Sequence, residues 1–139
     1  CETVLVRKEG EANHFCTNDK NCKPQILGGI EHFIQRKALN IDSLGSETIE
    51  QLFENNLVKN VADLYELNYN DLIELERFAE KSAKNLLKGI ELSKKKPFEN
   101  VLYGIGIRFV GNTVAEKLAL QFKTMENLQS LYKSLKLNV

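Results

Sequence analysis

The feature that most constrains the fold is an internal repeat. Residues 44–49 (LGSETI), 78–83 (FAEKSA) and 110–115 (VGNTVA) align with one another, at a period of about 33 residues, which is typical of stacked units of two or three short elements. Each unit reads as two helices joined by a short turn. The same period places a fourth copy beyond Val139, so residues 125–135 are expected to form the lead-in helix of a fourth unit.

Apolar residues from residue 25 onward follow helical spacing. The chain has two prolines, Pro24 and Pro97, and both stand at junctions between the expected helices. This pattern predicts a mainly helical fold. The apolar residues expected to face the core are Ile30, Phe33, Ile34 and Ala38, then Ile49, Leu52 and Phe53, then Ala83, Leu86, Leu87 and Ile90, and finally Val114, Leu118 and Phe122.

The turn of each unit leads into a helix with a polar first turn, and this arrangement favours an anion. The first N–H groups of a helix have no partner within it, and the helix dipole adds partial positive charge there. Glycine lets the backbone approach a phosphate closely. Side-chain donors also occur at these positions: Ser46, Lys81, Ser82, Asn112 and Thr113. A structural array whose glycines only cap helices is the alternative, but three turns in register favour backbone contacts to a nucleic-acid duplex.

The charges are unevenly distributed although the net charge is zero. Residues 42–76 carry nine acidic side chains and one basic, whereas residues 77–96 carry seven basic and two acidic. Electrostatic fields act locally because salt screens them over about 10 Å. A neutral chain can therefore present a positive face to a polyanion, although a charge run of this kind is also typical of a solvated helix surface.

The three cysteines, Cys1, Cys16 and Cys22, lie in a short segment that reads as a β-hairpin. A hairpin of this size cannot bury a hydrophobic core, so its fold needs another source of stability, such as a bound zinc ion. Structural zinc takes four ligands, commonly two close pairs of cysteines. Cys16 and Cys22 form one pair, and Cys1 is expected to belong to a second pair whose other member lies upstream. Three unligated thiols, or His14 as a substitute ligand, are the alternatives.

Four stretches resemble the bacterial NAD-dependent DNA ligases: residues 7–12 (RKEGEA), 32–39 (HFIQRKAL), 75–87 (LERFAEKSAKNLL) and 101–111 (VLYGIGIRFVG). The resemblance implies a mainly α fold, with tandem helix-hairpin-helix repeats after a small β-hairpin zinc-finger module. It divides the chain into a partial four-cysteine zinc finger at 1–24 and a DNA-binding domain at 25–139, with three repeats and the start of a fourth. It also implies that Cys1, Cys16 and Cys22 are three of the four zinc ligands.

The chain departs from the family pattern in its turns. Ser43 and Ala79 stand where glycine is common, as does Arg77, and Phe109 stands where histidine is common. We therefore expect the second and third repeats to contact phosphate best and the first to be largely structural. Arg77 is expected to restore affinity by its charge.

No catalytic motif of a ligase occurs in the sequence: the adenylated Lys-x-Asp-Gly is missing, as is a phosphate-binding loop. The resemblance implies that adenylation, NAD and magnesium belong to the rest of a longer ligase chain. No apolar run approaches the roughly 20 residues of a membrane span. A monomeric, cytoplasmic protein associated with the bacterial nucleoid is expected.

The expected function is gripping of nicked or duplex DNA to support nick sealing in replication and repair. A module of another helix-hairpin-helix repair protein and a helical scaffold for protein interactions are the alternatives. The residues expected to contact the DNA backbone are Arg36, Lys37, Gly45, Ser46, Arg77, Lys81, Ser82, Lys84, Gly106, Arg108, Gly111, Asn112 and Thr113.

Overall fold

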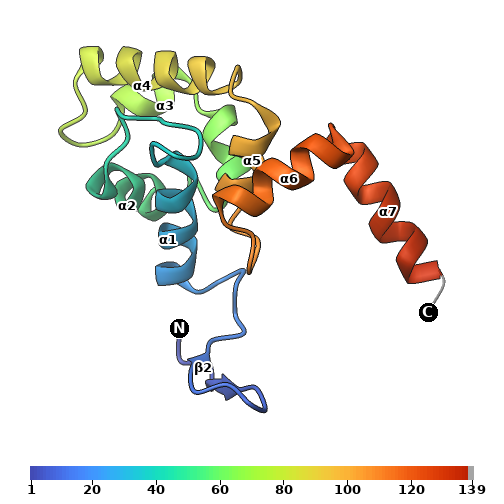
Figure 1. The fold of residues 1–139 in the computed structure, drawn as a ribbon. Coiled ribbons are helices and arrows are strands. Elements are labelled where there is room, and N and C mark those ends of the chain that lie inside the picture. Colours follow the sequence, from blue (N-terminus) through green and yellow to red (C-terminus); the bar gives the residue numbers. More distant parts are fainter. Residues whose placement is uncertain (138–139) are drawn as a thin grey trace.

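In a computed structural model, which describes residues 1–137, a small β-hairpin precedes a mainly helical body (Figure 1). The fold class predicted from the sequence is confirmed. The elements are β1 (Val6–Arg7), β2 (His14–Phe15), α1 (Lys23–Ile34), α2 (Ser46–Glu54), the 3-10 helix η1 (Val61–Glu66), α3 (Tyr69–Ile73), α4 (Glu80–Ser93), α5 (Phe98–Gly104), α6 (Asn112–Phe122) and α7 (Met125–Leu137).

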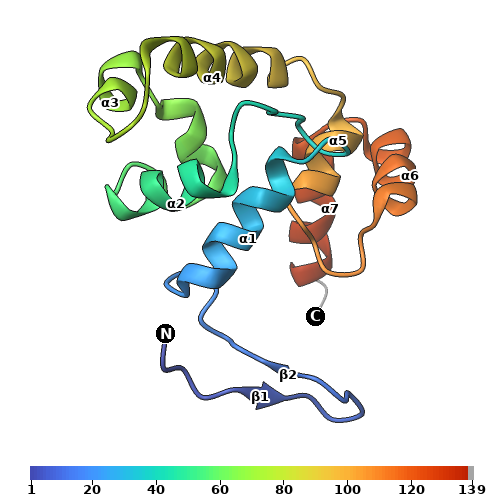
Figure 2. The ribbon, with the colours of Figure 1, turned by 90° about the vertical axis from the view of Figure 1, so that its left-hand side faces the viewer.

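Helices pair in the order that the internal repeat predicts. We name α1 and α2 the first repeat, α3 and α4 the second, and α5 and α6 the third. The turns that join them are the first turn (residues 41–45), the second turn (75–79) and the third turn (107–111). Helix α1 lies between α2 and α5, with α2 to α4 on one side and α5 to α7 on the other (Figure 2).

The β-hairpin is antiparallel, with Val6 paired to Phe15 and Arg7 to His14. Gly10 lies in its turn with a φ of 81°, a left-handed conformation that glycine adopts at little cost. None of residues 1–21 is buried. The hairpin therefore has no hydrophobic core of its own, and a sheet of two short strands is only marginally stable without further contacts.

The main hydrophobic core joins the first two repeats around α1. Its largest fully buried side chains are aliphatic: Ile30, Leu39, Ile41, Ile49, Leu52, Val58, Leu64, Leu72 and Leu86. The expected helical spacing that included Ala38 is wrong, because α1 ends at Ile34. Ala38 is fully buried in the turn that follows this helix.

A smaller core lies between α5 and α6, where Leu102 packs against Ala115 and Ala119. The sequence predicted Val114 and Phe122 on the buried face of α6, but Val114 is 41% exposed. Helices approach each other closely where their facing residues are small. The alanines therefore face α5, and of the predicted residues Leu118 packs against this core.

The first and third repeats meet where α1 ends. Asn100 donates its side-chain N–H groups to the carbonyls of Lys37 and Ala38, at 3.2 and 2.9 Å. His32 Nε2 donates to the carbonyl of Tyr103 at 2.8 Å, and Gln35 donates to His32 Nδ1 at 2.7 Å. The bonds from Asn100 and His32 satisfy carbonyls of the turn after α1 and of the end of α5, so they hold α5 against α1 and its turn.

Helix α7 extends away from the body beyond α6 (Figure 1). It includes residues 125–135, where the sequence predicts a lead-in helix. Leu131 and Leu135 are exposed on it, at 42% and 57%. Among the described residues, no helix has both the length and the apolar character that crossing a membrane requires.

Candidate nucleic-acid interface and metal site

The three turns share one pattern of backbone hydrogen bonds. In each, the residue before the N-cap donates its N–H to the carbonyl three residues earlier: Leu44 to Ile41 at 3.3 Å, Phe78 to Leu75 at 3.2 Å and Val110 to Ile107 at 3.0 Å. The N-cap carbonyl then accepts the first bond of the following helix. The sequence repeat therefore corresponds to a repeated local structure.

The helices that follow these turns begin without a side-chain cap. Their N-caps, Gly45, Ala79 and Gly111, have extended backbones and make no capping hydrogen bond. By contrast, Asn60 and Asn68 cap η1 and α3 with their side chains. The N-caps and first residues of α2, α4 and α6 are exposed. Their first N–H groups thus face solvent and offer donors, with the positive end of the helix dipole, to an anion.

The second and third turns differ from the first in backbone conformation. Arg77 has a φ of 61° and Phe109 a φ of 66°, so both occupy the left-handed region that favours glycine. Ser43, at the equivalent place in the first turn, is not in this region. Its hydroxyl donates to the carbonyl of Asn85 in α4 at 3.3 Å. The first turn is therefore bonded to α4 of the second repeat, and it lacks the left-handed residue that the second and third turns share.

The turns occupy two places on the molecule. The first and second turns lie on the same side (Figure 1), and Gln51 of α2 donates to the carbonyl of Glu76 in the second turn at 2.7 Å. Residues of α2 and of the second turn line one shallow cleft there. The third turn lies close to the β-hairpin, which Arg108 contacts.

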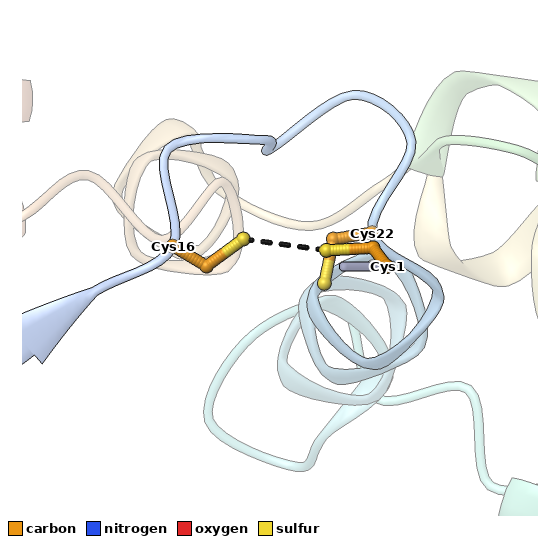
Figure 3. Close-up of side chains that lie close together, drawn as sticks. All are labelled: Cys1, Cys16 and Cys22. Carbon is orange, nitrogen blue, oxygen red and sulfur yellow. Dashed lines mark hydrogen bonds between the residues drawn. The ribbon is translucent and has the colours of Figure 1, made fainter. Parts of the chain in front are cut away.

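The three cysteines come together at the junction of the β-hairpin and α1 (Figure 3). Their sulfur atoms all lie within 4.8 Å of one another, and Cys1 Sγ is 3.5 Å from Cys16 Sγ. Tetrahedral zinc with Zn–S bonds of about 2.3 Å separates its sulfur ligands by roughly 3.8 Å. The cysteines therefore fit one zinc ion. His14 does not belong to this group of potential ligands, so nothing in the described part of the chain supports it as a substitute.

The position of Cys22 suits a thiolate ligand. It is the N-cap of α1, with its side chain buried, and the backbone N–H of Gln25 lowers the pKa of its thiol by hydrogen bonding. The next residue, Lys23, joins α1 to α2 by ion pairs with Glu50 at 2.6 Å and Glu54 at 2.8 Å. Glu50, and then Glu54, raise the pKa of Lys23 through these bonds.

Two families of known domains match parts of the chain. Residues 1–23 match the C4 zinc finger domain of NAD-dependent DNA ligases, and residues 100–134 match the helix-hairpin-helix motif. The resemblance to the NAD-dependent DNA ligases is confirmed. The helix-hairpin-helix match covers the third repeat and most of α7, and the ligase zinc-finger match covers the three cysteines.

Proteins that are similar to this chain over most of its length are named DNA ligase. The ligase of Cytophaga hutchinsonii is 63% identical over 129 residues, which are 93% of this chain and 19% of that protein. The ligases of Phocaeicola vulgatus and Flavobacterium johnsoniae are 59% and 58% identical over 92% of the chain, again 19% of each relative. The chain thus spans about a fifth of the length of the ligases that it matches.

The thirteen residues that the sequence analysis expects to contact the DNA backbone are all exposed. Three of them already have partners. Lys84 pairs with Glu80 at 2.7 Å, which raises the pKa of Lys84 and lowers that of Glu80. Asn112 donates to Glu116 at 3.2 Å. Arg108 pairs with Glu11 at 2.8 Å.

The other predicted cations are open to solvent. Within residues 1–137, no ion pair is found for Arg36, Lys37, Arg77 or Lys81. Arg36 and Lys37 follow the end of α1, whereas Arg77 and Lys81 flank the start of α4. The structure therefore brings Arg77 and Lys81 to the uncapped N-terminus of α4.

Sequence analysis did not identify the residues that Arg108 contacts. Its guanidinium contacts Glu11 and the rings of Phe15 and Phe109. Glu11 and Phe15 belong to the hairpin motif, but no spacing in the sequence connects residues so far apart. The resemblance included both segments, 7–12 and 101–111, without indicating that they touch.

Proposed function

We propose that the chain is the non-catalytic DNA-binding part of an NAD-dependent DNA ligase and grips nicked duplex DNA through backbone contacts. The observation that carries the proposal is the threefold recurrence of one turn followed by an exposed, uncapped helix. Backbone N–H groups and helix dipoles bind phosphate without reading bases. This suits an enzyme that must act at nicks of any sequence.

The proposal assigns residues 1–24 to a partial four-cysteine zinc finger. Residues 25–139 are assigned to a helix-hairpin-helix domain of three repeats and the start of a fourth. The last two residues lie outside the part that the structure describes. In this scheme Gly45, Gly106 and Gly111 allow close backbone approach, and the exposed side chains supply further donors: Arg36, Lys37, Ser46, Arg77, Lys81, Ser82, Lys84, Arg108, Asn112 and Thr113. The second and third turns contact phosphate best, because the first is packed against α4.

Cys1, Cys16 and Cys22 hold zinc in this proposal, since their sulfurs are grouped at a spacing that suits it. Zinc supplies a structural staple when bound, and the residues around it keep the hairpin on α1. Adenylation and phosphodiester formation, with NAD and magnesium, belong to other parts of the ligase chain. The protein acts as a monomer in the cytoplasm, on nucleoid DNA.

The proposal is tested by fluorescence anisotropy of labelled DNA across a salt series, with nicked and intact duplexes of two unrelated sequences. We expect affinity to fall steeply with salt and to be independent of sequence, with nicked duplex bound more tightly. Lys81→Gln is expected to reduce the slope of log K against log salt by about 0.9, the value for one phosphate contact.

Lys59→Gln is the matched control, because it removes the same charge from the acidic segment, and its slope should equal that of the wild type. Absence of binding by the wild-type chain, or binding that salt does not weaken, would overturn the proposal and favour a protein-interaction scaffold. Equal affinity for nicked and intact duplex would overturn the nick preference.

A further inference from the structure

The third turn and the β-hairpin are joined through one arginine. Arg108 Nη2 donates to both carboxylate oxygens of Glu11, at 2.8 and 2.9 Å. The guanidinium carbon also lies 4.7 Å from the centre of the Phe15 ring and 4.9 Å from that of Phe109. We call these four residues the Arg108 clasp. It combines a charge-assisted hydrogen bond with cation–π contacts, so it holds the guanidinium in one orientation.

Few other bonds hold the hairpin to the helices. Within residues 1–137, the remaining hydrogen bond between residues 1–16 and the helices runs from Gln25 to the carbonyl of Cys16 at 3.2 Å. That bond lies at the junction with α1, whereas the clasp lies toward the hairpin tip. A module attached at one end is free to swing. The contact at the tip therefore sets its direction.

The segment directly before the third turn is held against α1. His32 holds the carbonyl of Tyr103, and a Cβ at Gly106 would lie 3.5 Å from the His32 ring. Phe109, which is 85% exposed, adopts a left-handed φ of 66° that is costly for phenylalanine. The turn that carries Arg108 is therefore anchored where it begins, and it presents Phe109 beside the guanidinium.

We infer that Arg108 is a positioning residue that clasps the metal-binding hairpin to the third turn, so that the two face the DNA as one unit. Phe15, a member of the clasp, ends β2 and directly precedes Cys16, so the clasp also steadies the strand that leads into a proposed metal ligand. Nη2 donates to Glu11, and the carboxylate offsets part of the charge that the exposed guanidinium offers to phosphate. The role of the hairpin's orientation in DNA binding rests on the proposed function. The clasp itself does not depend on that function.

The test compares Glu11→Gln with Glu9→Gln, which removes an equal charge from the same hairpin outside the clasp. Hydrogen exchange is measured without DNA on the full chain. We expect Glu11→Gln to speed exchange of the hairpin amides about three- to tenfold, as befits loss of an exposed ion pair and a weakened cation–π contact. Glu9→Gln should leave that exchange unchanged. Unaltered exchange in Glu11→Gln would overturn the clasp.

The second readout is DNA affinity, for which the sign of the change is decisive. Removing a carboxylate near a polyanion strengthens binding if only charge matters, and Glu9→Gln is expected to do so slightly. Glu11→Gln should instead weaken binding, because the hairpin loses its orientation. If the hairpin amides of Glu11→Gln exchange faster but its DNA affinity is not reduced, the inference that the hairpin and the third turn face the DNA as one unit would be wrong. If the wild type binds no DNA, the proposed function fails while the exchange comparison still decides the clasp.

Discussion

At the scale of single residues, the contact between the first and third repeats depends on the absence of a side chain at Gly104. A Cβ there would lie 2.8 Å from Leu39 Cδ2, 3.1 Å from Phe33 Cδ2 and 3.2 Å from Ala38 Cβ. These neighbours are buried and cannot move without disturbing the main core. Gly104→Ala should therefore lower the free energy of unfolding by about 1–3 kcal/mol, measured by urea denaturation.

Gly28→Ala is the matched control, because Gly28 lies in the interior of α1 and nothing stands within 4 Å of a Cβ there. Alanine in an open helical position raises the free energy of unfolding by about 0.5–1 kcal/mol. The two identical substitutions should thus act in opposite directions. A stabilised Gly104→Ala variant would show that the interface between the repeats adjusts freely.

Arg77 illustrates a conflict between folding and binding at one position. Its left-handed φ of 61° suits glycine, while its charge beside the start of α4 suits a phosphate. We predict that Arg77→Gly raises the free energy of unfolding by about 1 kcal/mol, because the strain disappears. The same substitution should reduce the slope of log K against log salt by about 0.9, the value for one phosphate contact.

Urea denaturation and the anisotropy salt series measure these two effects. Arg77→Lys separates them, because it keeps the charge and the strained backbone, so both quantities should stay near the wild-type values. An unchanged salt slope in Arg77→Gly would refute the phosphate contact of Arg77. Reduced stability in that variant would refute the strain.

At the scale of the elements, uncapped helices exchange stability for open donors. Ala79 has the extended conformation of an N-cap but no side-chain acceptor. Ala79→Asp should cap α4 and raise the free energy of unfolding by about 0.5–2 kcal/mol. It should also weaken DNA binding, because the carboxylate occupies the N–H groups and repels phosphate. Thermal unfolding and anisotropy of the same preparation would show the two opposite changes.

Removing an existing cap elsewhere is the control for this prediction. Asn68 accepts the N–H of Asp71 at the start of α3, away from the turns. Asn68→Ala should cost about 1 kcal/mol of stability and leave DNA affinity unchanged. If Ala79→Asp binds DNA as tightly as the wild type, the start of α4 is not a phosphate site.

The presence of a helix after each repeated turn could be predicted from the sequence, because its causes are local. The repeated motif indicated that a helix with a polar first turn follows each turn, and α2, α4 and α6 begin within the three aligned segments. The buried face of α6 was not accessible, because Val114 and Ala115 are both apolar. Only the close approach of α5 decides that the alanine is buried. Ala38 was assigned to a helix for the same reason, since its burial depends on packing beyond the end of α1.

At the scale of the whole molecule, contacts between distant segments could not be predicted from the sequence. The cysteines could be grouped because metal ligands have a typical spacing, and the structure brings them together. Glu11 and Arg108 could not be paired, because an ion pair leaves no periodic signal. Acidic and basic residues are also numerous enough here to allow many pairings. Which turns lie side by side is likewise a result of packing.

The helical body has a hydrophobic core and the N-terminal hairpin has none. This difference predicts how the molecule responds to loss of metal. The buried core begins at Cys22, and residues 1–21 contribute no buried side chain to it. A chelator should therefore remove exchange protection from residues 1–21, while the far-UV helical signal and the urea midpoint of the helical body change little. Adding zinc back should restore protection in the wild type and not in Cys16→Ser. If the helical signal were lost on chelation, the stability of the helical body would depend on the metal. The division of the chain at residue 24 would then be wrong.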